Sequence, residues 1–443
     1  MMKKSRFNIK LKDYQGQVSL QKRPDSLDYY LLGIVLFVTL LIPGIHVTAS
    51  FYLNLEELIV PILGVRLLQK AFFWIDYYVL GLAAFSLVIL LTIVLNPRYL
   101  QLGEYFEIYK MLKFTVLYVY AFFVFSNKPS AQTVINFVSF LFLCVATFNL
   151  IHYFDLFKFN TYCTILYDSD GRDTLLFGKN SIGEPGPKRI VGTMGNPNMN
   201  AIVFLLFFSF FSFLILEKKN EKSSWNIGSS YKANVLMMMS AYFVILCQSR
   251  TALVAMGVIF ILTWFFRRNS IQVILSEMAM LIGFYALIYF SNPMSVNYIA
   301  STQVGIEGFE ENSSLQGRKA SWVYFFNQWK SNPILGYGPN KGFVYANNLH
   351  PESQYLFYAW RYGLLGLACL FFLLFYPAAC FIKQFAQYSF IWMVSLVIGV
   401  TSLMSNPIDN SKIALLFAIC IGFSFGLHYS NTALLTPSKA VHK

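Results

Sequence analysis

Charged residues are scarce in this sequence. Only 12% of the 443 residues are charged and 56% are hydrophobic, whereas a soluble domain carries about 25% charged residues. This composition excludes an ordinary soluble domain and predicts a membrane protein with several spans. The formal net charge of +13 does not indicate nucleic-acid binding, because the Lys and Arg residues lie mainly in short clusters between apolar runs.

Cysteines are also few, six in all, and none forms a C-x-x-C pair or a His/Cys cluster with zinc spacing. Only Cys163 falls in a clearly polar loop, where no second cysteine is available to pair with it. The sequence therefore predicts no disulfide framework, no metal site and no cofactor. A polar, basic stretch precedes the first apolar run, which begins at residue 29. A cleavable signal peptide would place its apolar region sooner, so we expect this first span to be retained.

Apolar runs of about 20 residues are long enough to cross a bilayer. The predicted fold is an all-α polytopic membrane protein with about twelve transmembrane helices, and the second of these is the weakest because Glu56, Glu57, Pro61 and Arg66 interrupt it. The second span either crosses the membrane completely or forms a tilted or re-entrant helix. Further along the chain, a tight junction at Ser249–Thr251 separates the spans 232–249 and 250–267. The twelve ranges are 29–49, 54–70, 74–95, 109–126, 132–154, 197–217, 232–249, 250–267, 270–290, 353–377, 387–405 and 412–430.

Basic residues in the short loops predict the orientation of these spans. Twelve spans put both termini on one side, together with the basic tail and most of the Lys and Arg clusters, so this side is expected to be cytoplasmic. Residues 1–28 then form a cytoplasmic tail and residues 29–443 a single membrane domain. The outer loops 155–196 and 291–352 are expected to cap an active site, and the larger one is expected to contain amphipathic helices.

Two arginines lie near the predicted outer ends of spans. Lys188 and Arg189 precede a Gly-rich turn and Asn196-Pro197-Asn198, where a helix start with free N–H groups would make an anion cradle. Arg250 sits at a junction whose flanks are nearly all apolar, and a cation there is costly unless it is paired or solvated. For both, the alternative is an interfacial side chain that extends to the membrane surface.

A third arginine, Arg318, begins an aromatic stretch in the large loop. At helical spacing Arg318 and Trp322 share one face, as do Phe325 and Trp329. This pattern predicts an amphipathic helix that either lies on the membrane surface or covers a cavity, and Trp322 is either structural or part of a platform for sugars. Arginine is planar, always charged and bidentate, so the three arginines suit a phosphate or pyrophosphate.

The end of the large loop offers two candidate general bases, Glu352 and His350. Glu352 falls where a helix should begin, so the helix dipole is also a purely structural reason for a carboxylate. His350 titrates near neutrality. Arg361 lies about two to three turns further on, and it either pairs with a carboxylate or marks the floor of a cavity. Asp168 and Asp170 are half of an acidic metal motif, but a solvated turn explains them better.

Taken in order, these stretches resemble the O-antigen ligase/polymerase family of bacterial envelope glycan enzymes, with the glycosyltransferase C architecture. The resemblance covers about residues 190–370, and each motif alone is weak. The motifs are Gly192-x-x-Gly195-Asn196-Pro197-Asn198, Ser249-Arg250-Thr251, Arg318-x-x-x-Trp322, Pro333-Ile334-x-Gly336-x-Gly338, Ser353-x-Tyr355-Leu356 and Gly363-Leu364-Leu365-Gly366.

The resemblance implies metal-independent transfer of a glycan from undecaprenyl diphosphate at the outer face of a bacterial inner membrane. Arg250 and Arg318 match the family's arginines, Arg189 matches more loosely, and Trp322 and Tyr355 are candidate glycan contacts. The implied partners are the lipid-linked glycan and membrane lipid, with a chain-length regulator protein as a further candidate and no nucleic acid.

One departure bears on the branch of the family. Ligases tend to carry His-Asn-x-Tyr-Leu, whereas this chain has Glu352-Ser353-Gln354-Tyr355-Leu356, which favours a polymerase over a ligase. A transporter of lipid-linked sugars would show repeat symmetry and cations at mid-membrane. It remains a further alternative, as does a non-catalytic scaffold for glycan assembly.

Overall fold

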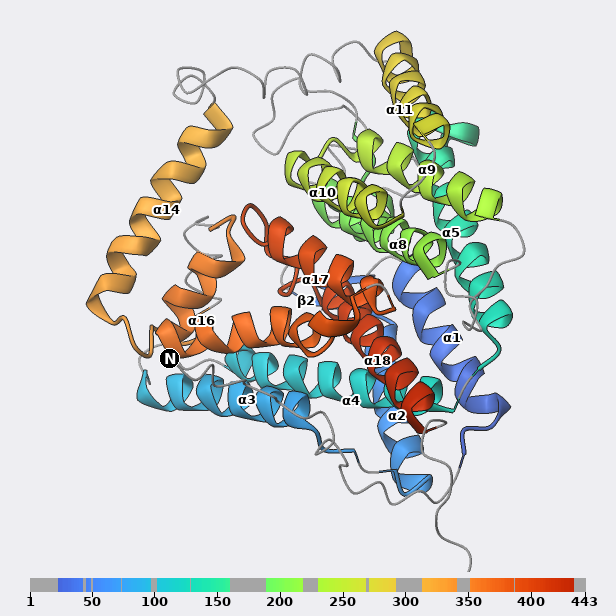
Figure 1. Cartoon of the computed structure of the whole chain (residues 1–443). Coiled ribbons are helices and arrows are strands. Elements are labelled where there is room, and N and C mark those ends of the chain that lie inside the picture. The colour runs from blue at the N-terminus through green and yellow to red at the C-terminus, as the bar shows by residue number, and fades with distance from the viewer. Residues whose placement is uncertain are drawn as a thin grey trace, which may run out of the picture.

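In the computed structural model the described part of the chain is a bundle of helices with a short β-hairpin (Figure 1). The structure describes residues 23–42, 45–48, 51–72, 74–96, 102–127, 129–159, 189–217, 230–267, 271–291, 313–340, 351–385 and 387–433. Residues 1–22 of the predicted tail, Cys163, Asp168, Asp170, Lys188 and His350 lie outside these ranges.

Each of the twelve predicted span ranges overlaps an α-helix, and within the described residues of the predicted large loop there is a further helix, α14. The α-helices are α1 (Ser26–Leu41), α2 (Glu56–Gln69), α3 (Tyr77–Leu95), α4 (Phe106–Ser126), α5 (Ala131–Phe154), α8 (Pro197–Glu217), α9 (Ser230–Cys247), α10 (Arg250–Arg267), α11 (Ile271–Ser291), α14 (Ser313–Ser331), α16 (Gln354–Cys380), α17 (Ser389–Thr401) and α18 (Ser411–Ala433). Short 3-10 helices are η3 (Leu102–Tyr105), η4 (Leu156–Lys158), η6 (Gly192–Met194) and η7 (Ile382–Gln384).

Six of these helices have the length and hydropathy of membrane spans in the described part of the chain. They are α3, α4, α5, α8, α16 and residues Ser411–Asn431 of α18. Helices α1, α9, α10, α11 and α17 contain shorter apolar segments, and α2, the span with interrupting charges, is in neither group. The crossing of the membrane by all twelve helices stays a prediction.

The predicted extent of the first span is wrong. Helix α1 ends at Leu41 rather than near residue 49, and an antiparallel hairpin of β1 (Ile45–Thr48) and β2 (Phe51–Leu53) follows. Ile42 is extended, with φ −101° and ψ 119°, because a residue before proline avoids the helical region. The β-branched Ile45, Val47 and Thr48 then favour a strand.

Helix α8 is buried along nearly its whole length. Helix α18 packs closely along α4, where Gly422 and Gly426 are placed against the backbone of α4. A Gly-x-x-x-Gly spacing allows two helix backbones to approach in this way. Figure 1 shows α14 standing at the edge of the molecule beside α16. The fold thus leaves α14 as a peripheral helix attached through α16.

At one end of the bundle, α1 begins where α2 and α4 end. The fully buried Asp28 accepts hydrogen bonds from Arg66 Nε (2.9 Å) and Tyr120 Oη (3.1 Å). Asp25 caps α1 and pairs with Lys70 (2.8 Å) and Arg66, and these two cations hold the pKa of Asp25 well below its ordinary value. We call this the Asp28 end. The alternating directions of the predicted spans place the start of α1 and the ends of α2 and α4 on one side of the membrane, and these are the helix ends that meet here.

Candidate functional site

The opposite end of the bundle, which we call the Asp409 end, is where α2, α4, α16 and α18 begin. Lys113 on α4 donates to Glu57 on α2 (2.7 Å) and to Ser411 on α18 (3.3 Å). Lys412 donates to the carbonyls of Ile42 after α1 and of Thr193 in η6. The contacts of Lys412 join the segment that carries Arg189 to the rest of this end.

Arg189 bridges three segments at the Asp409 end. Its Nε donates to the carbonyl of Cys247 (3.0 Å), and its Nη2 donates to Asn198 Oδ1 (3.1 Å) and to the carbonyl of Gln248 (3.2 Å). Carbonyls at a helix C-terminus carry partial negative charge and lack partners within the helix. Arg189 therefore stabilises the end of α9 and ties it to the start of α8.

The turn after Arg189 rests on two buried asparagines that the sequence reasoning missed. Asn200 Nδ2 donates to Asn149 Oδ1 (2.8 Å) and to the carbonyl of Ile190 (3.4 Å). Gly192 has a φ of +54°, and a Cβ there would collide with Asn200 and Asn149. An asparagine inside an apolar span, such as Asn149, was the available signal, because a buried amide needs a hydrogen-bond partner.

Asn196 ends the same turn and caps α8. Its Oδ1 accepts from the backbone N–H of Asn198 (2.8 Å) and Met199 (3.3 Å), and its side chain is exposed. The predicted helix start at Asn196-Pro197-Asn198 is confirmed. Because the side chain of Asn196 already accepts hydrogen bonds from two N–H groups at the start of α8, fewer N–H groups remain there to bind an anion.

Arg250 is the first residue of α10 and is half-buried. Only Gln248 and Ser249 separate α9 from α10, as the sequence predicts, and Gln248 has a left-handed φ of +52°. The carbonyls of Cys247 and Gln248 that Arg189 binds lie just before Arg250. The structure therefore brings two of the three candidate arginines to one junction.

The third arginine meets a candidate base. Arg318 on α14 forms an ion pair with Glu352 through Nε and Oε2. The two side chains are 22% and 42% exposed, so the pair lies near the surface of the protein. Arg318 and Glu352 are 34 positions apart, and their contact could not be read from the sequence.

A break in α16 sets the position of the segment that links α14 to Glu352. Gly363 has φ +63° and ψ −160°, which divides α16 into two segments. The N–H groups of Tyr337 and Gly338 donate to the carbonyls of Trp360 (3.0 Å) and Arg361 (2.7 Å) on one side of the break. On the other side, the N–H of Leu364 donates to the carbonyl of Pro333 (2.8 Å).

Residues 333–338, which we call the plug, thus satisfy the backbone groups that the break would leave open. A broken helix is tolerated at membrane depth only when other parts of the protein supply these hydrogen bonds. Gly336 has a φ of +65°, and a Cβ there would lie 2.5 Å from the carbonyl oxygen of Trp360. The motifs Pro333-Ile334-x-Gly336-x-Gly338 and Gly363-Leu364-Leu365-Gly366 also contact each other directly, because Leu364 and Leu365 donate to the carbonyls of Pro333 and Ile334.

An aromatic cluster attaches α14 above the plug. Phe325 is fully buried, and its ring lies 4.9 Å from that of Trp360 and 6.4 Å from that of Phe357. The Tyr337 ring stacks on Trp360 at 6.0 Å. Val323 and Phe326 on the other face of α14 are 52% and 44% exposed. The predicted helix is confirmed, and its inner face fixes Arg318 relative to α16.

Arg361 belongs to a buried network of charges. It is 2% exposed, its guanidinium lies 3.5 Å from the centre of the Phe357 ring, and its Nη1 donates to Asp409 (3.4 Å). Lys110 donates to Asp409 (3.1 Å) and to Glu107 (3.0 Å). Of the two predicted roles for Arg361, the structure has the pairing with a carboxylate.

The remaining candidates, Trp322 and Tyr355, lie on α14 and α16. Trp322 is half-buried. The hydroxyl of Tyr355 donates to the carbonyl of Gly399 (2.8 Å), and its ring stacks on Phe371 at 5.3 Å. The hydroxyl proton of Tyr355 thus has an acceptor within the fold.

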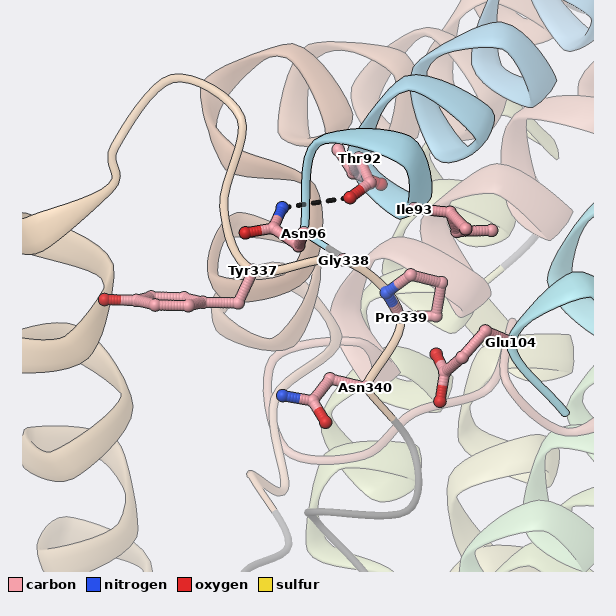
Figure 2. A pocket seen from close by; sticks show the side chains of 8 residues that line it. All are labelled: Thr92, Ile93, Asn96, Glu104, Tyr337, Gly338, Pro339 and Asn340. Atoms are coloured by element: carbon pink, nitrogen blue, oxygen red, sulfur yellow. Dashed lines mark hydrogen bonds between the residues drawn. The ribbon is translucent and has the colours of Figure 1, made fainter. Parts of the chain in front are cut away.

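A small pocket lies beside the plug, at the end of α3 (Figure 2). Asn96 closes one side, and its amide donates to the carbonyls of Thr92 (2.9 Å) and Gly336 (3.5 Å). Figure 2 shows the side chains of Glu104 and Asn340 on the opposite side. The lining residues are Thr92, Ile93, Asn96, Glu104, Tyr337, Gly338, Pro339 and Asn340. The candidate arginines and Glu352 are not part of this pocket.

Within the described ranges, no group of three or more His, Cys, Asp and Glu side chains is arranged to hold a metal ion. Arginines and lysines supply the positive charge at the Asp409 end.

Part of the chain is similar to a known protein family. Residues 235–371 match the protein family described as O-antigen ligase. This range holds Arg250, Arg318, Glu352, Arg361 and the plug, whereas Arg189 precedes it. Among curated proteins, none matches the chain. Together with the apolar helices, the match supports a multi-pass membrane protein with an O-antigen ligase- or polymerase-like function. Over residues 235–371 the chain is therefore similar to the O-antigen ligase family, which is consistent with the O-antigen ligase/polymerase family that its motifs resemble.

Proposed function

We propose that this chain is a membrane polysaccharide polymerase that transfers a glycan from undecaprenyl diphosphate to a hydroxyl group of another lipid-linked repeat unit. The contact between Arg318 and Glu352, inside the matched range 235–371, carries the proposal. Such a transfer needs a group that accepts a proton and cations that stabilise a departing diphosphate. In this proposal Glu352 accepts the proton and Arg318 is one of the stabilising cations.

In the proposed step, the acceptor oxygen forms a bond to the anomeric carbon while the bond from that carbon to the diphosphate oxygen breaks. The hydroxyl proton passes to the Glu352 carboxylate, with His350 as the alternative base. The electron pair of the broken bond leaves on undecaprenyl diphosphate. Arg318 uses Nε for Glu352, and a guanidinium has five N–H donors in all, so the same side chain is able to bind a phosphate oxygen.

Arg250 is the second proposed contact of the diphosphate. It begins α10, and a helix N-terminus carries partial positive charge and open N–H groups. We assign Arg189, Lys188 and Asn196 to the same anion-binding region, because Arg189 is bound to the α9–α10 junction. Trp322 and Tyr355 are the proposed glycan contacts. No metal is required in this scheme, since arginines hold the leaving group.

We propose that the Asp409 end faces the periplasm and that both termini lie in the cytoplasm. The basis is the distribution of Lys and Arg in short loops, most of which fall on the Asp28 side. Loops 155–196 and 291–352 would then cap the site, with residues 29–443 as one membrane domain. This arrangement gives Glu352 and Arg318 access to lipid-linked glycans on the outer face of the inner membrane.

The family description favours a second candidate, an O-antigen ligase. In that reaction the same groups would act, but the acceptor hydroxyl would belong to a lipid A-core or a protein. The identity of the acceptor separates the two candidates.

The test uses the full chain, purified in detergent, with a synthetic undecaprenyl-diphosphate repeat unit and a chelator. Products are resolved by size. We expect a ladder of increasing length, which Arg250→Ala and Glu352→Gln abolish. Arg267→Ala is the matched control, because it removes an arginine from the opposite end of the same helix, α10.

A single transfer that appears only when a lipid A-core or protein acceptor is added would support the ligase instead. Absence of any transfer, together with movement of the lipid across liposome membranes, would refute the enzyme and support a transporter. Equal loss of activity in Arg267→Ala and Arg250→Ala would contradict the role of Arg250.

A further inference from the structure

The loop between α17 and α18 holds the chain on both sides of Glu352. Asn406 Nδ2 donates to the carbonyl of Pro351 (2.9 Å), one residue before Glu352. Two residues after it, the N–H of Gln354 donates to the carbonyls of Ser402 (2.9 Å) and Ser405 (3.2 Å). The side chain of Gln354 is fully buried, and its Oε1 accepts from the N–H of Ile408 (3.0 Å).

This loop is itself anchored to three helices. Asp409 binds Lys110 on α4 (3.1 Å) and Arg361 on α16 (3.4 Å). Asn410 caps α18, since its Oδ1 accepts from the N–H of Ile413 (3.1 Å). The carbonyl of Asn406 accepts from the N–H groups of Asp409 (3.2 Å) and Asn410 (3.3 Å). The loop is therefore a fixed frame against which the chain around Glu352 is placed.

We propose that Asn406 and Gln354 are positioning residues for Glu352. They fix the backbone on either side of it, so that its carboxylate meets Arg318 from α14. Glu352 stands just ahead of α16, where the hydrogen bonds of the helix do not yet hold the backbone. Its side chain is 42% exposed, so packing restrains it little. This inference rests on the proposed function for its catalytic consequence, but the anchoring is measurable without catalysis.

The loop offers a matched pair of substitutions. Asn406→Asp keeps the shape of the side chain but replaces its N–H donor by a carboxylate opposite the Pro351 carbonyl. Asn410→Asp makes the same change four residues later, where the asparagine oxygen accepts a hydrogen bond and an aspartate still does. Gln354→Leu is an independent variant that removes the acceptor for Ile408.

The first measurement is amide hydrogen exchange of the full chain in detergent, followed in peptides that cover residues 351–357. We expect Asn406→Asp and Gln354→Leu to speed exchange there by about tenfold or more, because local opening becomes easier. Asn410→Asp is expected to match the unsubstituted protein. Equal exchange in Asn406→Asp and Asn410→Asp would overturn the proposal.

The second measurement is steady-state glycan transfer with the lipid-linked repeat unit. We expect kcat to fall about tenfold to a hundredfold in Asn406→Asp, because a small displacement of a catalytic group is costly. KM for the donor stays unchanged, since the arginines are untouched. A loss that merely reflects fewer folded molecules would also appear as lower recovery on size exclusion.

The two measurements separate the two claims. If the unsubstituted protein transfers no glycan to any acceptor, the proposed function fails, and the exchange result alone then decides whether Asn406 and Gln354 fix residues 351–357. If exchange rises but kcat stays unchanged, Glu352 does not need this placement and the positioning role is refuted.

Discussion

Replacing Gly363 by alanine tests whether the break in α16 depends on glycine. With φ +63° and ψ −160°, Gly363 lies in a region that only glycine adopts readily, and another residue there costs about 1–3 kcal/mol. A Cβ would also collide with the Ile334 carbonyl. This collision would displace the plug from the N–H groups of Leu364 (2.8 Å) and Leu365 (3.4 Å), at about 0.5–1.5 kcal/mol for each bond.

We therefore expect Gly363→Ala to lower the free energy of unfolding by about 2–6 kcal/mol. The assay is unfolding of the purified protein by SDS in mixed micelles, followed by tryptophan fluorescence. Gly257→Ala in α10 is the matched control, because nothing lies within 4 Å of an added Cβ there and alanine favours a helix by about 1 kcal/mol over glycine. Equal stability of Gly363→Ala and Gly257→Ala would refute the account of the plug.

Three further substitutions test the Asp409 ion pairs, the buried asparagine pair and the proposed orientation. Asp409→Asn leaves buried cations with less compensation, so we expect a loss of about 3–5 kcal/mol in the same unfolding assay. Asn149→Leu removes the nearest acceptor of the buried Asn200 amide and leaves it the longer contact with the Ile190 carbonyl, at a cost of about 1–3 kcal/mol, and an effect below 0.5 kcal/mol would contradict this. In a Cys163→Ser background, an impermeant maleimide should label Asn196→Cys in intact cells and Gln384→Cys only after lysis, because these exposed sites belong to opposite predicted sides. The reverse pattern would refute the proposed orientation.

The apolar runs and the polar or proline-containing segments between them predicted most of the helices. A segment of about 20 apolar residues in a membrane has few other ways to satisfy the hydrogen bonds of its backbone. The two-residue junction before Arg250 and the start of α8 at Asn196-Pro197-Asn198 were also visible locally. The first span was overextended, since residues 45–53 are apolar enough to continue it. The count of apolar residues outweighed the local signal from Pro43, which ends the helix.

The sequence identified Arg250, Arg318 and Glu352 as unusual, but their partners could not be read from it. An ion pair such as Arg318 with Glu352 depends on how α14 packs on α16, and nothing local in either segment encodes that contact. Asn406 and Gln354 gave no signal at all, because a loop asparagine and a helix-start glutamine are common residues whose importance lies in what they face. The buried pair of Asn149 and Asn200 spans 51 positions for the same reason.

By itself, the sequence indicated a helical membrane protein, where most of its helices lie and which of its charges need an explanation. These properties follow from local composition and spacing, which act on each segment separately. Only the tertiary structure decided which charges meet, how the plug fills the break at Gly363 and how the α17–α18 loop holds the chain around Glu352. Such contacts form between segments distant in sequence, so they depend on the packing of the whole bundle.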